Sequence, residues 1–437
     1  MFVRFLVCLL PLVGLSNGAG AEPGSSIRIS AYEFSVRYAP PDSGLNITAD
    51  LSLVNPGSDS SVAFLFSSRV RIGAINWIVG PDTLTADYHQ SPPETLVIAV
   101  PRVAMRQSES KLNLTYLYPL QANDSTMILL DRGHRWYPLI PTNIAQCRMR
   151  LNVPKGWFAV TGGDLVSIDS AGQSVQSVWQ SHIPMFKVML GIGRSEQYVQ
   201  LSEKAEPTTL FVICRPVDSV SAREILQEAA KAFAYFSQRV GPYPHLRLTF
   251  IETSMFPGAN LGTSIVALGS DMLGPMDRGR AAMLDLAVAS QWFGAGVFGK
   301  FQEEGFWFLT LSLPHYERLL YLRDTQGEEA FRKDLDGNLD RYRKFAGSAN
   351  DIPILRVDYL NTQEKGNAVA FKGPYLLDRV RQKMGDEPWR AFVRTLYTKK
   401  SGQMLTCREF LHELDRFDHH TAYWLSLALV APGMPEK

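Results

Sequence analysis

Imidazole and carboxylate side chains are the groups that could hold a metal ion in this chain of 437 residues. The candidate imidazole ligands are scattered along it, at His134, His182, His245, His315, His412, His419 and His420. His419 and His420 are adjacent, and neighbouring side chains on a helix point about 100° apart instead of toward one ion. A catalytic zinc site uses three protein ligands as a rule, so these histidines by themselves predict no metal site.

One stretch has the spacing of a zinc-binding helix without its ligands. Residues 285–294 read Asp-Leu-Ala-Val-Ala-Ser-Gln-Trp-Phe-Gly. In a helical His-Glu-x-x-His motif, residues four apart share one face, so two imidazoles bind one Zn²⁺ and the Glu polarises the metal-bound water. Leu286, Ala287 and Ser290 occupy these three positions here. Such residues cannot do that chemistry, but they avoid the cost of burying an unpaired charge.

The continuation Gln291-Trp-Phe-Gly294 carries a family resemblance. It resembles the end of the active-site helix in the aminopeptidase N family, which are gluzincin zinc metallopeptidases. The resemblance implies a third ligand in an Asn-Glu-Gly-Phe turn, and Glu303-Glu-Gly-Phe306 is similar to that turn. Glu304 therefore matches the ligand glutamate, although the joining segment is about five residues shorter than in the family. Because one carboxylate binds Zn²⁺ poorly, we expect Glu304 to be solvated or salt-bridged.

Two other family elements are also degenerate. Residues 256–262 resemble the Gly-Ala-Met-Glu-Asn substrate loop: Asn260 and Gly262 match, while Ala259 stands where a Glu would pair with the peptide's amino group. Residues 370–373 resemble a Tyr-x-Lys-Gly element, whose tyrosine donates a hydrogen bond to the tetrahedral intermediate. Ala370 has no hydroxyl. The resemblance thus implies no catalytic residue and no bound metal.

The first half of the chain has the pattern of an antiparallel β domain, which we place at residues 22–205. Short segments alternate between apolar and polar residues and are separated by Gly, Pro, Asn and Asp. Residues 134–141, 151–157 and 160–163 also resemble the saddle-shaped β domain of the family's bacterial branch. The clearest segments are Ile27–Ala31, Leu45–Leu51, Val62–Phe66, Thr95–Val100 and Leu112–Tyr116.

From residue 206 to 437 the pattern changes to helices with a few strands. Ser221 with Glu224 predicts a capping box at the start of a helix that ends near Val240, and Thr406 with Glu409 predicts a second one. The resemblance implies a thermolysin-like α/β and helical domain, without the large helical domain that closes the cleft in many relatives. The predicted fold class is α+β and multidomain, with a β saddle or sandwich first.

Residues 1–21 have the composition of a secretory signal, with Arg4, an apolar run from Phe5 to Leu15 and a small-residue cleavage site at residues 19–21. We therefore expect a protein that is exported to the periplasm or secreted. With 44 basic and 43 acidic residues, the chain has no electrostatic preference for nucleic acid, and no stable membrane span is predicted. Apart from Cys8 in the predicted signal, the cysteines are Cys147, Cys214 and Cys407, which allow one disulfide at most.

These observations predict a pseudopeptidase of the aminopeptidase N type that has lost its zinc site and binds a peptide or protein partner. An extended peptide could add to the strand near residues 262–268 by β-augmentation. The alternative is an active zinc aminopeptidase with a non-standard metal site, in which case Glu304 would be essential and zinc the cofactor. The sequence leaves the partner, the peptide preference and the oligomeric state open.

Overall fold

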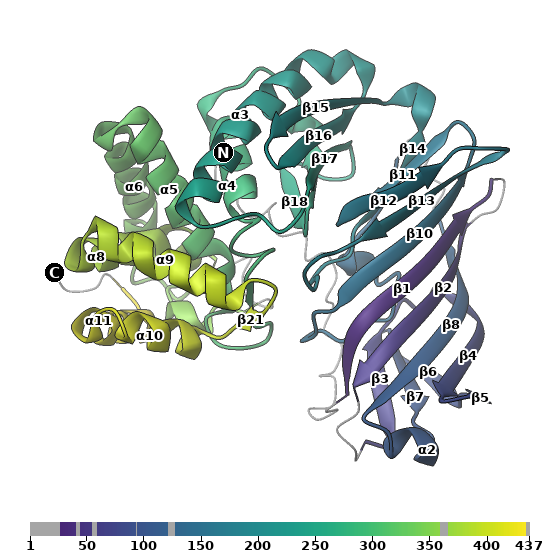
Figure 1. Cartoon of the computed structure of the whole chain (residues 1–437). Coiled ribbons are helices and arrows are strands. Elements are labelled where there is room, and N and C mark those ends of the chain that lie inside the picture. The colour runs from purple at the N-terminus through teal and green to yellow at the C-terminus, as the bar shows by residue number, and fades with distance from the viewer. Residues whose placement is uncertain are drawn as a thin grey trace.

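The computed structural model describes residues 27–40, 44–54, 59–92, 94–120, 127–358 and 366–433. The predicted export signal at residues 1–21 lies outside these ranges. Figure 1 shows a β domain, a central mixed layer and a helical region at the C-terminal side. This confirms the predicted fold class, with a β-rich domain first and helices last.

The β domain is built on one large sheet of eight strands in the order β12-β13-β10-β1-β2-β8-β4-β5. Alternation of buried and exposed residues along each strand gives the sheet one apolar and one polar face, as in β2, where every second residue is buried. The pairing is antiparallel except between β1 and β10, which run parallel. The strands are β1 (Arg28–Tyr38), β2 (Gly44–Val54), β4 (Arg71–Val79), β5 (Asp82–Thr85), β8 (Glu109–Pro119), β10 (Gln146–Pro154), β12 (Asp164–Asp169) and β13 (Ser174–Gln180).

Two small sheets complete this domain, in the orders β3-β7-β6 and β11-β14-β9. The aromatic residues of the segment at 134–141 join the apolar side: Trp136 and Tyr137 are buried and pack against Phe34. The remaining elements are β3 (Ser61–Leu65), β6 (Tyr88–Ser91), β7 (Thr95–Ala99), β9 (Met127–Leu130), β11 (Trp157–Thr161), β14 (Leu190–Arg194) and the short helix α2 (Arg102–Met105).

A five-stranded sheet forms the central layer, in the order β15-β16-β17-β19-β18. Its strands are β15 (Val199–Ala205), β16 (Thr208–Cys214), β17 (Arg247–Thr253), β18 (Ala259–Gly262) and β19 (Ile265–Gly269). Neighbouring residues point to opposite faces. Val212 and Phe250 join the core beneath the helices, whereas Ile213 and Ile251 join the core of the β domain. The two cores therefore share this sheet, and a domain boundary near residue 205 stays a proposal.

Helices make up most of the rest (Figure 1). The predicted capping box at Thr406 is confirmed: its hydroxyl accepts from the Glu409 amide at 3.1 Å, and the Glu409 carboxylate accepts from the Thr406 amide at 2.8 Å. The box predicted at Ser221 is wrong, because the helix already begins at Ser219, after Pro216–Asp218. The helices are α3 (Ser219–Arg239), α4 (Arg278–Ala289), α5 (Leu313–Gln326), α6 (Glu328–Arg343), α8 (Gly373–Met384), α9 (Asp386–Lys400), α10 (Cys407–Asp415) and α11 (His419–Val430).

No helix in the described part of the chain is both long enough and apolar enough to cross a membrane. Cys147, Cys214 and Cys407 are each buried and free. The short strands β20 (Phe298–Gly299) and β21 (Met404–Leu405) pair in parallel and connect the loop after α4 to the start of α10.

Candidate functional site

The helix α4 and its C-cap residue Ser290 carry the positions that the family resemblance predicts to correspond to a metal site. Asp277 starts it by accepting hydrogen bonds from the amides of Gly279 and Arg280, at 2.8 and 2.9 Å. All residues from Ala282 to Ala289 are buried. A helix that is buried all round lies in the middle of a core rather than on its surface. The sequence therefore places these positions on a central helix between the five-stranded sheet and α5, as Figure 1 shows.

The side chains at the three positions predicted to correspond to two zinc ligands and the general base are buried in this core. Leu286 is 3% exposed, Ala287 0% and Ser290 2%. The Ser290 hydroxyl donates to the Leu286 carbonyl at 2.7 Å, so its only proton is already used within the helix. Leucine and alanine carry no donor atom for a metal. The residues present at these positions therefore do not fit a zinc ion.

Glu304 does not join them. It is exposed, in the turn that precedes the helical segment beginning at Phe306. If the segment between α4 and this position were five residues longer, as in the family, the residue at the position would be Leu309 instead of Glu304. Leu309 is 3% exposed and belongs to the π-helical turn Phe308–Ser312. With the shorter connection, the Glu304 carboxylate is exposed to solvent near Cys407, at the start of α10. Burial, together with the negative charge of Glu304, raises the pKa of the Cys407 thiol to about 12.

The substrate-loop positions lie on β18, at the edge of the central sheet. Ala259 is fully buried and offers no carboxylate. Asn260 is 2% exposed, and its amide donates to Asp131 of the β domain at 2.8 Å. A Cβ on Gly262 would lie 2.9 Å from the Ile265 side chain, so the hairpin itself requires a glycine here. Asn260 and Gly262 therefore each have a structural role in this fold, whether or not they correspond to a substrate loop.

The Gln-Trp-Phe-Gly sequence after α4 also has a structural explanation. The Gln291 side chain donates to the Gly262 carbonyl at 3.2 Å and accepts from the Ser264 amide at 3.0 Å. Trp292 is fully buried and donates to the Gly241 carbonyl at 2.8 Å. These bonds attach the β18–β19 hairpin and the end of α3 to α4, which explains how the sequence can persist without ligands beside it.

Ala370 lies in the π-helical turn Ala368–Lys372, 4% exposed. Its carbonyl oxygen lies 3.1 Å from Nδ1 of His315, which is buried on α5. Burial lowers the pKa of His315 to about 3, so the ring is neutral at pH 7 and donates to this carbonyl. The next residue, Phe371, is 2% exposed. No hydroxyl stands at either position.

A charged cluster that sequence reasoning missed joins β18 to the β domain. Asp131 lies 3.3 Å from the Lys187 ammonium and 2.8 Å from Nδ1 of His134, and Lys187 also donates to Asn260. Burial alone would raise the pKa of Asp131, but Lys187, His134 and Asn260 hold it well below its ordinary value. Burial lowers the pKa of Lys187, and Asp131 opposes this change. The signal was present in the sequence as a charged residue directly after the apolar strand Met127–Leu130.

Next to this cluster, Arg132 of the β domain contacts aromatic rings at the junction between the domains. Its guanidinium lies 3.8 Å from the centre of the Phe186 ring and 5.3 Å from that of Phe301, and donates to the Phe186 carbonyl at 2.9 Å. Phe186 in turn packs against Phe301 and Phe306 of the turn that carries Glu304. Aromatic rings and a buried cation therefore fill this side of the junction.

No three His, Cys, Asp or Glu side chains in the described ranges lie close enough together to hold a metal ion. Two of the histidines instead each pair with one carboxylate. His182 lies 2.7 Å from Asp164, and His419 lies 2.6 Å from Asp415.

Comparison with known proteins places the fold. No family model and no curated protein matches the sequence. Among solved structures, a two-domain M1 zinc metallopeptidase mutant bound to L-arginine has a TM-score of 0.74 at 16% identity and covers 94% of this chain and 95% of its own. A mutant M1 zinc metallopeptidase from Deinococcus radiodurans has a TM-score of 0.75 at 14% identity, covering 94% and 96%. Native yeast LTA4 hydrolase has a TM-score of 0.75 at 13% identity, covering 94% of this chain and 69% of its own.

The chain therefore has the two-domain fold of the M1 zinc metallopeptidases. At these identities the likeness concerns the fold alone, and function has to be argued from the site.

Proposed function

We propose that this protein is an exported, non-catalytic member of the M1 fold that binds extended polypeptide. The observation that carries the proposal is the sealed state of α4. Leu286, Ala287 and Ser290 stand at the predicted positions of two zinc ligands and the general base. They are at most 3% exposed and offer no imidazole or carboxylate, and the Ser290 hydroxyl donates to the Leu286 carbonyl. Each element of a metal-assisted hydrolysis contributes orders of magnitude to the rate, so a site without metal and base has no route to amide cleavage.

The metal content of the purified protein tests this proposal. The protein is exposed to zinc, desalted and analysed by mass spectrometry, and its hydrolysis of leucine and arginine p-nitroanilides is measured with and without a chelator. We expect no stoichiometric metal and no chelator-sensitive hydrolysis. About one zinc per chain, with hydrolysis abolished by Glu304→Ala, would establish the active metallopeptidase instead.

For peptide binding, the structure corrects the predicted strand. Residues 265–268 belong to β19, which lies between β17 and β18, and all four are 0% exposed. β19 therefore cannot accept another strand, and the edge strand at this end of the sheet is β18. The register pairs Asn260 with Ala267 and Gly262 with Ile265 around a two-residue turn. In such a hairpin these pairs exchange hydrogen bonds, so the backbone groups of Leu261, between them, point to the free edge.

A proline substitution separates binding at this edge from folding. Leu261→Pro removes an outward N–H without removing a β18–β19 hydrogen bond, and proline is tolerated on edge strands. Leu261→Ala is the matched control. We expect the parent and the alanine variant to bind a blocked Thr-Val repeat peptide with equal affinity, unaffected by chelator, and the proline variant to bind at least tenfold more weakly. Equal binding by all three variants would exclude β-augmentation at β18.

A further inference from the structure

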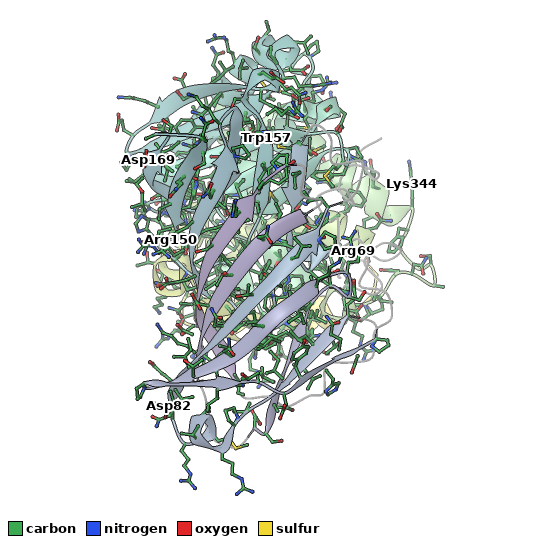
Figure 2. All side chains as sticks on the ribbon, turned by 90° about the vertical axis from the view of Figure 1, so that its right-hand side faces the viewer. Arg69, Asp82, Arg150, Trp157, Asp169 and Lys344 are labelled. Carbon is green, nitrogen blue, oxygen red and sulfur yellow. The ribbon has the colours of Figure 1, made fainter. Side chains whose placement is uncertain are left out.

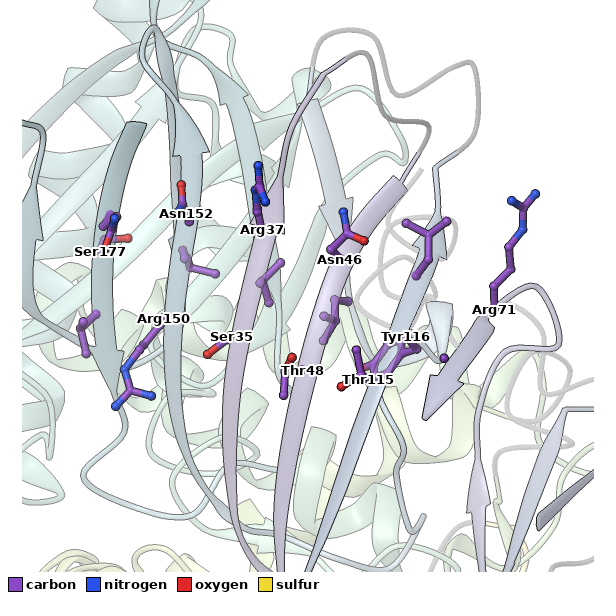
Figure 3. A pocket seen from close by; sticks show the side chains of 17 residues that line it. Ser35, Arg37, Asn46, Thr48, Arg71, Thr115, Tyr116, Arg150, Asn152 and Ser177 are labelled. Carbon is purple, nitrogen blue, oxygen red and sulfur yellow. The ribbon is translucent and has the colours of Figure 1, made fainter. Parts of the chain in front are cut away.

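The outer face of the large sheet has a shallow hollow of 570 Å³, well away from the M1 site positions. Figure 2 looks onto this face, and Figure 3 shows the hollow from close by. It is formed by side chains that alternate outward from β1, β2, β4, β8, β10 and β13, so no helix or loop of the described chain covers it. Six strands at about 4.8 Å apart make this face about 24 Å wide.

The register aligns two rows of outward-facing side chains across these strands, all of them polar except Leu117 and Val178. The first row runs Gln176, Asn152, Arg37, Asn46, Leu117 and Arg71, and the second runs Val178, Arg150, Ser35, Thr48 and Thr115. In Figure 3 Arg37 stands between Asn152 and Asn46, with Arg150 and Arg71 on strands to either side. Amide and hydroxyl groups therefore fill the spaces between three guanidinium groups.

These three arginines have no partner of opposite charge in the described part of the chain. Arg37, Arg71 and Arg150 are all exposed, and none forms a salt bridge there. None of the described residues that line the hollow is acidic. Two carboxylates of this face, Glu33 and Asp50, belong to the next row, where Glu33 pairs in register with Arg148 and Asp50 accepts a hydrogen bond from Asn113 at 2.6 Å. A third, Asp169 on β12, pairs in register with Gln176 at the end of the first row. The hollow is therefore a positive surface that has carboxylates at its borders and none in its lining.

We propose that this face binds an acidic polypeptide segment in extended conformation, lying across the strands. The lining favours a polypeptide over other anionic polymers. Nucleic acid bases are held by stacking on exposed aromatic rings, and the one aromatic residue in the lining, Tyr116, is 3% exposed. Asn, Gln, Ser and Thr side chains supply both donors and acceptors for a peptide backbone.

The spacing of the arginines fits the same occupant. Arg37 and Arg150 lie on adjacent strands and two positions apart, about 8 Å, and Arg37 and Arg71 lie three strands apart, about 14 Å. In an extended peptide, residues two apart are about 7 Å and residues four apart about 13 Å from each other. Carboxylates at such positions can each pair with one guanidinium, in the bidentate geometry that arginine favours. Asp50 in the next row, and Asp169 at the Gln176 end of the first row, repel the same carboxylates and so favour a segment that stays on the arginine rows.

Fluorescence anisotropy with a blocked, labelled decaglutamate peptide tests the proposal at low salt. We expect saturable binding that weakens as NaCl is raised, because exposed charge pairs are screened. The triple variant Arg37→Gln, Arg71→Gln, Arg150→Gln is expected to bind at least tenfold more weakly. The matched control replaces three exposed arginines elsewhere, Arg102, Arg106 and Arg223, with the same change in net charge, and should bind within twofold of the parent.

A gain of affinity would be an outcome that misfolding cannot imitate. Leu117→Arg adds a cation to the first row between Asn46 and Arg71 and should bind decaglutamate several-fold more tightly than the parent. The proposal is overturned if the control triple variant loses as much affinity as the first, or if blocked decaglutamine binds as well as decaglutamate. It is also overturned if polygalacturonate or polyphosphate binds through the three arginines while decaglutamate does not. Leu261→Pro should leave decaglutamate binding unchanged, so the two proposals fail independently.

Discussion

Replacing Asp285 by asparagine is expected to stabilise the helical region, and to do so most at alkaline pH. Asp285 lies on α4 directly before Leu286 and is 5% exposed. Its Oδ1 atom is buried without a hydrogen-bond partner among the described residues. Burial raises its pKa from 3.8 to about 7, against the attraction of Arg318. Arg318 does not neutralise it, because that side chain donates to Asp334 at 3.0 Å.

The sign and size of the effect follow from linkage. The folded protein holds the Asp285 proton more tightly than the unfolded chain, so this residue lowers the free energy of unfolding as pH rises from about 4 through about 7. One pKa unit corresponds to about 1.4 kcal/mol, which makes the full loss about 4 kcal/mol, with about 2.5 kcal/mol of it between pH 5 and pH 8. Asparagine has nearly the same shape and is neutral at every pH.

Thermal unfolding of parent and variant, followed by circular dichroism at pH 5 and pH 8, measures this difference. We expect Asp285→Asn to raise the unfolding temperature at pH 8 by clearly more than at pH 5. Asp82→Asn, an exposed residue of β5, is the control and should leave the pH dependence as in the parent. If Asp285→Asn instead destabilises the protein equally at both pH values, the carboxylate is ionised and paired in the fold, and the account of α4 as a sealed apolar element is wrong.

Three other perturbations test the same core. Glu317→Ala should lower the free energy of unfolding, measured in urea, by about 3–5 kcal/mol, because it leaves the buried Arg239 guanidinium without the carboxylate that binds it at 2.9 Å. Removing the exposed Glu328 carboxylate should lower it by less than about 1 kcal/mol. Burial lowers the pKa of His315 to about 3, so the unfolded chain binds this proton more tightly and the fold loses stability as pH falls below about 6.5. His315→Gln should reduce the loss of stability between pH 7 and pH 4.5, and an unchanged loss would show that His315 is not its source. The triple variant Leu286→His, Ala287→Glu, Ser290→His should hold no stoichiometric zinc by mass spectrometry until Leu309→Glu is added to supply a third ligand. Zinc uptake by the triple variant alone would show that the exposed turn at Glu304 can supply that ligand.

The fold was predictable because its signals are local. Alternation with period two along β2 and β8, helical periodicity in α3, and the capping box at Thr406 each depend on residues a few positions apart. The Ser221 capping box failed for the same reason: the motif is local, but the preceding turn at Pro216–Asp218 had already started the helix.

The candidate site was predictable only in part. The sequence showed that Leu286, Ala287 and Ser290 supply no imidazole or carboxylate, since this depends on residue type. It also predicted a solvated or salt-bridged Glu304, which is exposed in the structure. It did not show that β18 and not β19 is an edge strand, or that Asp131 and Lys187 bind Asn260. These facts depend on pairings between segments far apart in the chain, which no short pattern encodes.

The sequence by itself determined which chemistry the α4 positions are unable to perform, because a leucine or an alanine has no metal ligand in any fold. It also determined the alternation that gives the β sheet a polar face. Only the tertiary structure decided that the three arginines lie on one surface without carboxylates between them, since the pairings of β1 with β10 and β2, and of β8 with β2 and β4, set their register. Charges far apart in sequence form one surface only when the register of the strands brings them together.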